Sequence, residues 1–218
     1  MNLRGGKLLR LGNAYSPRFQ TNTEVLLLSA PARQGWCYHL LANWNVASQK
    51  LDTLWYNEEV CNRVINLSRN RKVVALIRSD AYSQMAEYID ILDTAGTVIN
   101  PKVATSTGLI RILGGPKFSP NAQLIVWVAE HWLQLTDLKT RETRRLAERL
   151  MTDDFAWSPY GGEIAFAFNP PINPKECSTC PRSVAKQAPG LFTVDIGGRM
   201  FERINYENRA EKQIFWVK

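Results

Sequence analysis

The chain has 218 residues, of which 45% are hydrophobic and 10% aromatic, and such a chain can bury the core of one domain. No apolar run approaches the roughly 20 residues of a membrane span. Residues 1–10 hold no apolar segment long enough for a secretory signal. We therefore expect a protein without a membrane span, cytoplasmic by default.

The formal charge of +7 points toward an anionic partner. The 27 Lys and Arg residues are, however, dispersed along the sequence and form no dense basic tract. This distribution favours the interpretation that the charge keeps the protein soluble, and the alternative is nucleic-acid binding.

In chain order, short polar segments that contain a serine each precede an apolar strand. The serines are Ser16, Ser68, Ser119 and Ser158, and the strands are predicted over residues 25–28, 73–77, 124–128 and 163–168. These serines are 52, 51 and 39 residues apart. A repeat of about 40–50 residues rich in short strands is typical of propeller blades.

A second landmark follows each of these strands. A further apolar strand ends in Asn or Asp at a turn, at Asn45, Asp93, Asp137 and Asp195, and another strand comes after the turn. That next strand is predicted over residues such as 51–55 and 142–146. A short amphipathic helix over residues 139–151 is the alternative. We prefer the strand over 142–146, with room for a helical turn over 147–151.

The sharpest copy of the pattern is W-S-P-Y-G-G at residues 157–162, where the glycines suit a tight turn. It resembles the W-S-P-D-G-K-like turn of TolB-type and WD-repeat-like β-propellers, and the resemblance covers nearly the whole chain. The resemblance implies an all-β fold, with one β-propeller domain over residues 1–218.

We expect about five blades in this propeller. Four complete blades are predicted over residues 13–55, 62–100, 116–146 and 153–204, and residues 1–12 and 206–218 together form a composite closing blade. Closure of this kind removes the free edge of a sheet. The alternative is an arc of a larger propeller.

Four long segments interrupt the pattern, at residues 30–35, 78–85, 101–115 and 169–190. Residues 101–115 are predicted to be a long connection that carries the breaker Gly114-Gly115-Pro116, although 109–113 is apolar enough for a strand. Residues 169–190 hold five of the 11 prolines and are predicted to be a surface loop. All four segments fall in connections that share one end of a propeller, and this long-loop face is the predicted binding surface. Its candidate binding residues are Arg33, Trp36, Arg78, Tyr82, His131, Lys175, Arg182 and Lys186.

The cysteines Cys37, Cys61, Cys177 and Cys180 map to the same face or its rim. Cys177 and Cys180 have the two-residue spacing of a metal knuckle or a redox pair, but no second pair follows. Unpaired structural thiols, a local disulfide and a zinc site completed by other residues all remain open. We predict no metal centre and no cofactor, and keep Cys177 and Cys180 as weak metal candidates.

No catalytic residue is predicted. No serine lies in a G-x-S-x-G elbow, and no phosphate-binding G-x-x-x-x-G-K loop occurs in the sequence. The adjacent Asp153 and Asp154 point to opposite faces of a strand and cannot act together. Trp44, Trp127 and Trp157 sit at strand positions, where packing between blades is favoured over base stacking.

The sequence therefore favours a non-catalytic, protein-binding propeller that serves as a scaffold or accessory subunit of a larger assembly. The first alternative is a gating or regulatory propeller associated with a separate peptidase or other enzyme domain. The second is a nucleic-acid or anionic-surface binder. Salt dependence separates them, because counterion release weakens nucleic-acid binding steeply as salt rises.

Overall fold

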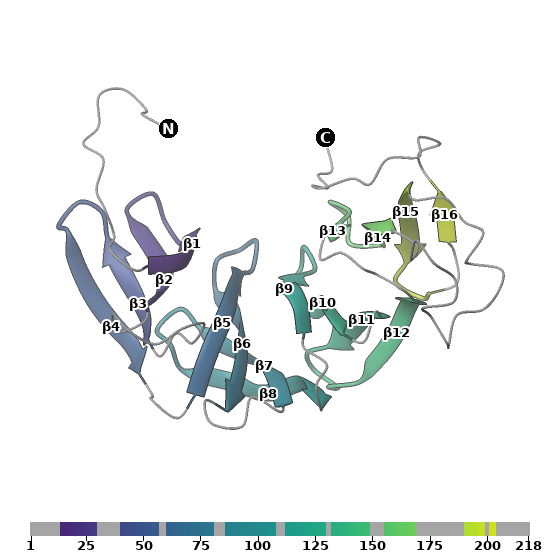
Figure 1. Cartoon of the computed structure of the whole chain (residues 1–218). Coiled ribbons are helices and arrows are strands. Elements are labelled where there is room, and N and C mark those ends of the chain that lie inside the picture. Colours follow the sequence, from purple (N-terminus) through teal and green to yellow (C-terminus); the bar gives the residue numbers. More distant parts are fainter. Residues whose placement is uncertain are drawn as a thin grey trace.

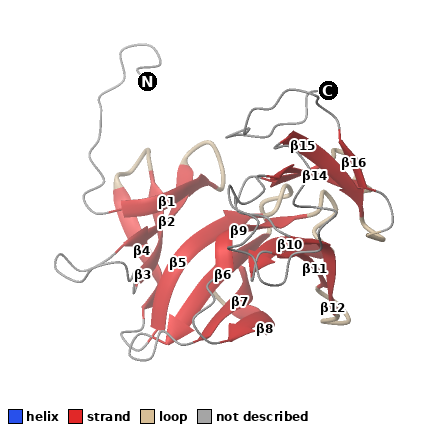
Figure 2. Ribbon diagram, turned by 45° about the vertical axis from the view of Figure 1, so that its right-hand side comes forward, coloured by secondary structure: helices blue, strands red, loops and turns tan. Residues whose placement is uncertain are grey.

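A computed structural model describes residues 14–29, 40–56, 60–80, 86–107, 112–129, 132–148, 155–168, 190–198 and 201–203. Every regular element in these ranges is a β-strand. The strands form four sheets that follow one another along an arc, with the first and fourth sheets at its two ends (Figures 1 and 2). Within this part of the chain no helix is long and apolar enough to cross a membrane.

Each sheet contains four strands in chain order, and all neighbouring strands are antiparallel. Sheet 1 comprises β1 (Ala14–Phe19), β2 (Glu24–Ser29), β3 (Leu40–Asn45) and β4 (Lys50–Tyr56). Sheet 2 comprises β5 (Val60–Leu67), β6 (Val73–Asp80), β7 (Ala86–Asp93) and β8 (Val98–Thr107). Sheet 3 comprises β9 (Ile112–Phe118), β10 (Leu124–Ala129), β11 (Trp132–Asp137) and β12 (Thr143–Glu148). Sheet 4 comprises β13 (Phe155–Trp157), β14 (Glu163–Phe168), β15 (Gly190–Asp195) and β16 (Phe201–Arg203).

Because the strands are antiparallel, the connections alternate between the two ends of each sheet. At one end, which we call the turn face, lie the tight turns 20–23, 46–49, 68–72, 94–97, 119–123, 138–142, 158–162 and 196–198. The connections at the other end lie outside the described residues. The predicted closing blade, residues 1–12 and 206–218, also lies outside them.

Successive side chains of a strand point to opposite faces of its sheet, and apolar residues occupy both faces here. In β6, for example, Val74 and Leu76 pack toward sheet 1 while Ala75 and Ile77 pack toward sheet 3. Three cores result, one between each pair of consecutive sheets. Such a series of face-to-face sheets explains why the hydrophobic pattern repeats along the sequence.

Serine side chains fix three of the tight turns. Ser68, Ser119 and Ser158 are buried directly after the first strand of their sheets, and each hydroxyl accepts the N–H of the residue five positions later, at 3.0–3.2 Å. The predicted equivalence of Ser16 is wrong, because Ser16 lies inside β1. The register of β1 shifts between Tyr15 and Arg18, around Pro17, and proline tolerates such an edge-strand irregularity.

The second landmark is confirmed in all four sheets, since β3, β7, β11 and β15 end at Asn45, Asp93, Asp137 and Asp195. The Asp137 carboxylate accepts the N–H groups of Lys139 and Thr140 at 2.7 and 3.0 Å. Hydrogen bonds from these two backbone groups lower the pKa of Asp137. The Asp137 side chain therefore stabilises the turn that follows it.

The predicted long connection at residues 101–115 is wrong. Residues 101–107 belong to β8, and β9 begins at Ile112. Gly114-Gly115-Pro116 forms an irregularity inside β9, where the pairing with β10 shifts between Val126 and Val128. Both β8 and β9 are edge strands of their sheets, where a proline costs no ladder hydrogen bond.

Two further expectations concern strand ends. The helix alternative over 139–151 is wrong where it can be checked, because β12 covers 143–148 and Ala147 pairs with Leu133. The predicted loop at 78–85 begins too early, since β6 continues through Asp80. Arg78 is thus a strand residue, paired with Asn62 on one side and Tyr88 on the other.

Candidate functional site

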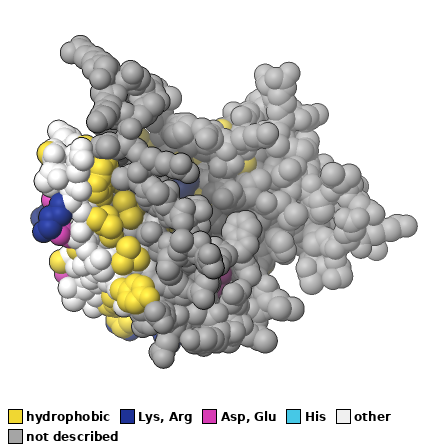
Figure 3. Space-filling view, turned by 60° about the vertical axis from the view of Figure 1, so that its left-hand side comes forward, with side chains coloured by type: hydrophobic (Ala, Val, Ile, Leu, Met, Phe, Trp, Pro, Cys, Tyr) yellow, Lys and Arg dark blue, Asp and Glu magenta, His cyan; other side chains and the backbone are white. Residues whose placement is uncertain are grey.

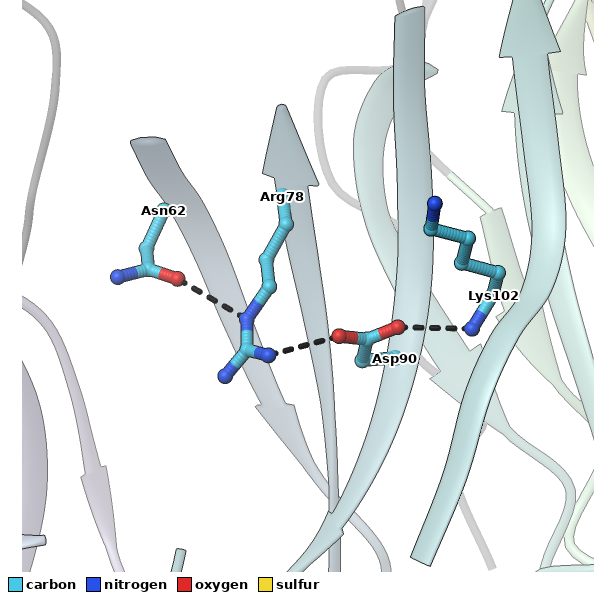
Figure 4. A network of polar contacts seen from close by, with 4 residues as sticks. All are labelled: Asn62, Arg78, Asp90 and Lys102. Carbon is cyan, nitrogen blue, oxygen red and sulfur yellow. Dashed lines mark hydrogen bonds and ion pairs between the residues drawn. The ribbon is translucent and has the colours of Figure 1, made fainter. Parts of the chain in front are cut away.

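A network of buried polar side chains crosses sheet 2 at the level of Arg78. The Arg78 guanidinium donates from Nη1 to Asp90 Oδ2 at 2.7 Å and from Nε to Asn62 Oδ1 at 3.2 Å. The second oxygen of Asp90 accepts the backbone N–H of Lys102 at 2.7 Å. Figure 4 shows these four residues side by side, one from each strand of the sheet.

This network also reaches sheet 1. The guanidinium carbon of Arg78 lies 4.2 Å from the centre of the Trp55 ring, in β4. The Arg78 and Asp90 side chains are only 5% and 6% exposed. Burial lowers the pKa of Arg78, and the charge of Asp90 opposes that shift. The ion pair therefore places two buried charges in the seam between sheets 1 and 2, and each charge stabilises the other there.

A second buried carboxylate ties sheet 2 to sheet 3. Glu87 is 4% exposed and accepts the backbone N–H of Ile112, the first residue of β9, at 2.6 Å. Ser79 and Ser106 flank Glu87 on the neighbouring strands and are also buried. These polar groups position consecutive sheets relative to one another.

Of the predicted binding residues, Arg78 is the one that the described ranges contain. It is buried in the network above, and a role in binding stays a prediction for it. The others, Arg33, Trp36, Tyr82, His131, Lys175, Arg182 and Lys186, lie outside the described residues, as do Cys177 and Cys180. Where side chains are described, no three His, Cys, Asp or Glu residues are placed to hold a metal ion.

Sequence reasoning missed an apolar patch on sheet 1. On the face of this sheet turned away from sheet 2, Leu51 pairs across strands with Trp44, and Tyr56 pairs with Leu40. Leu51 and Tyr56 are 49% and 51% exposed, and Leu40 and Trp44 are half-buried. In Figure 3, which brings the side of sheet 1 forward, hydrophobic side chains form a band across the described surface. The alternation of β4 was visible in the sequence, but which of its faces is uncovered was not.

A pocket of about 440 Å³ opens at the turn end of sheet 3. Its lining consists of Leu124, Leu135, Asp137, Glu142, Thr143 and Arg144. The two leucines give the pocket an apolar wall, and the turn that follows β11 gives it a polar rim. No sequence motif marks this pocket, because its lining comes from three strands and a turn.

The sequence matches no protein-family profile and no curated protein. The structure is similar to TolB from Acinetobacter baumannii, with a TM-score of 0.56 at 16% identity over 88% of this chain and 44% of TolB. It is similar to the β-propeller domain of the Trilobed protease from Pyrococcus furiosus, with a TM-score of 0.57 at 11% identity over 88% of this chain and 57% of that one. An oligogalacturonate lyase in complex with manganese gives a TM-score of 0.56 at 11% identity, over 84% and 47% of the two chains.

The chain thus spans about half the length of these solved proteins, from 44% to 57%. Identities at this level establish a common fold and nothing about activity. Together with the four antiparallel sheets packed face to face, the similarities show that this chain has a β-propeller fold like that of TolB.

Proposed function

We propose that this chain is a non-catalytic, protein-binding β-propeller that acts as a scaffold or accessory subunit of a larger assembly. The observation that carries the proposal is the apolar patch of Leu40, Trp44, Leu51 and Tyr56 on the outer strands of sheet 1. A contiguous exposed apolar patch on a folded protein commonly marks a contact with another protein. Aromatic side chains such as Trp44 and Tyr56 are also the residues that dominate interface energies.

The position of the patch supports this reading. The opposite face of sheet 1 is covered by sheet 2 through Leu26, Leu28 and Leu41, which are fully buried. On the patch side, burial falls from the inner strand to the outer one, since Val25 is 3% exposed and Leu51 is 49% exposed. The outer half of this sheet face is therefore open to a partner.

The buried polar network supports a structural rather than a chemical role for the charges of sheet 2. Arg78, Asp90 and Asn62 form hydrogen bonds with one another and with the backbone.

A second candidate function is a propeller that accompanies a separate enzyme domain. It draws support from the similarity to the propeller domain of the Trilobed protease.

The test is affinity capture with the intact chain from extracts of its source cells, followed by identification and reconstitution of the captured protein. The double variant Leu51→Gln, Tyr56→Gln removes the apolar patch, and we expect its affinity for the purified partner to fall at least roughly ten-fold. Thr105→Gln, an exposed change on β8 of the neighbouring sheet, is the matched control. Melting temperatures of all variants should stay close to that of the parent.

The long-loop face is tested in the same assay. Replacement of residues 170–189 with a short glycine-containing hairpin should leave folding intact, because loop length changes closure entropy only slightly. Loss of partner binding in this variant, with the patch variant unaffected, would assign binding to the long-loop face. Unchanged binding in both variants would contradict the proposed protein contact at either surface.

A further inference from the structure

The tight turns of the four sheets form one connected surface. Arg71, in the first turn of sheet 2, donates to the carbonyl of Gln20 in sheet 1 at 3.1 Å. Asn100 of β8 donates to the carbonyl of Leu138 in sheet 3 at 2.8 Å. A Cβ placed on Gly161 of sheet 4 would lie 3.2 Å from the ring of Pro120 in sheet 3. The turn face is therefore continuous across the arc.

Exposed cations gather in the middle of this face, on sheets 2 and 3. Each lies in a tight turn or within the first five residues of the strand that follows it. These exposed residues are Arg69, Arg71, Lys72, Lys139, Arg141 and Arg144. The same turns carry the carboxylates of Asp93, Asp137 and Glu142, so cations outnumber carboxylates by six to three.

Two of these carboxylates already have backbone partners. Asp93 accepts the N–H groups of Ala95 and Thr97 at 2.9 and 2.8 Å, and Asp137 accepts two turn N–H groups as described above. These bonds hold the two carboxylates in their turns without removing their charge, so the exposed cations exceed the carboxylates by three. A local excess of this kind attracts an extended polyanion, and the attraction weakens with salt.

An exposed aromatic ring lies on the same turn face, in the neighbouring sheet 4. Tyr160, in the turn of sheet 4 that contacts Pro120, is 97% exposed. Trp127 is buried and Trp157 is half-buried, and their ring N–H groups donate to Thr136 Oγ1 and the Lys117 carbonyl, both at 2.9 Å. Tyr160 is free of such a role in packing. A positive surface with an exposed aromatic ring is the combination that binds single-stranded nucleic acids.

We propose that the turn face of sheets 2 and 3 binds single-stranded nucleic acid, with the arginines and lysines on its phosphates and Tyr160 stacked on a base. Arginine provides most of the cations, and its planar fork suits phosphate oxygens. The described cationic turns are interleaved with Asn70, Thr140 and Thr143, and the exposed large apolar side chains beside them are Val98 and Ile99. This surface is distinct from the apolar patch of the proposed protein contact.

Fluorescence anisotropy with a labelled oligouridylate of about 20 nucleotides tests the proposal on the intact chain. The variant combines Arg69→Gln, Lys72→Gln, Lys139→Gln and Arg141→Gln. In the described structure, none of these four side chains forms a hydrogen bond or an ion pair, so the fold should persist. Each lost phosphate contact changes the slope of log affinity against log salt by about 0.7, and the variant's slope should flatten by roughly 3.

That change in slope has a direct consequence for affinity. Between about 50 and 200 mM salt, the parent should lose roughly 50-fold more affinity than the variant. Tyr160→Ser should lower affinity at least about five-fold at every salt concentration, as expected for a lost stacking contact. The double variant Leu51→Gln, Tyr56→Gln should bind the oligonucleotide like the parent.

The matched control removes the same charge at four positions outside the described residues, through Arg4→Gln, Arg10→Gln, Lys212→Gln and Lys218→Gln. If this control and the turn-face variant lose affinity equally, net charge and not the turn face governs binding, and the proposal is overturned. No binding of the oligonucleotide at about 50 mM salt would overturn it as well. Equal affinity for polyglutamate, or for vesicles of phosphatidylserine and phosphatidylcholine, would refute the nucleic-acid assignment.

Discussion

The ion pair between Arg78 and Asp90 offers the sharpest test of the structure. Asp90→Asn keeps an oxygen that can accept the N–H of Lys102 but removes the charge that balances Arg78. Arg78→Met keeps much of the side-chain volume and leaves Asp90 without its cation. Because both side chains are about 95% buried, we expect each single substitution to cost about 3–5 kcal/mol of unfolding free energy.

The double variant should behave differently from the sum of its parts. With Met at 78 and Asn at 90, neither position of the buried pair carries a charge. One Arg78 nitrogen, Nη2, has no hydrogen-bond partner in the parent, so the guanidinium is incompletely compensated to begin with. We expect the double variant to be more stable than additivity predicts by at least about 2 kcal/mol.

Urea unfolding, followed by far-ultraviolet circular dichroism and tryptophan fluorescence, measures these differences. Lys50→Met is the control, because Lys50 pairs with Asp52 at 2.9 Å with side chains 71% and 52% exposed. That surface pair should contribute less than about 1 kcal/mol. If Arg78→Met costs no more than the Lys50 control, or if the two single effects are additive, the buried pair is not the coupled unit described here.

Three further predictions concern packing, pH and a turn. Phe166→Ala should cost about 3–5 kcal/mol, because Phe166 is fully buried, whereas half-buried Trp157→Ala should cost less in the same urea titration. The lowered pKa of Asp137 stabilises the fold above the ordinary aspartate pKa, and this contribution is lost as pH falls through the lowered value. Thermal melts from neutral to acid pH should therefore show a weaker acid dependence for Asp137→Asn, and an unchanged profile would contradict the turn-fastening role. Gly96→Ala should lower the melting temperature more than Gly198→Ala. Both glycines have a positive φ, +89° and +71°, but only the Cβ added at position 96 would come within 2.9 Å of another atom, the Cβ of Leu54.

The sequence by itself determined the repeating framework of the fold. Alternating apolar residues predict strands at the positions of β2, β6, β10 and β14, and the Asn or Asp that ends each third strand was placed correctly. These features are local, since a period of two and a side chain that caps its own turn depend on neighbouring residues. Errors arose where the local signals conflict, as in residues 101–115, where Pro and Gly occur inside edge strands.

Long-range features were decided by the tertiary structure alone. Arg78 belonged to a predicted loop, and its ion pair with Asp90 emerges only because the register of β6 and β7 sets the two side chains in one seam. Packing between blades was expected for Trp157, and the packing of sheet 4 on sheet 3 covers it only in part. Neither outcome is encoded in residues close together in the chain.

The charges give the clearest contrast between the two levels. Along the sequence the Lys and Arg residues are dispersed, and the turns around Arg71 and Arg141 are 70 positions apart. In the fold, the alternation of antiparallel strands returns every such turn to the same end of its sheet, and packing between sheets joins those ends into one surface. Composition fixes how much charge the chain carries, whereas strand topology and sheet packing decide where that charge collects.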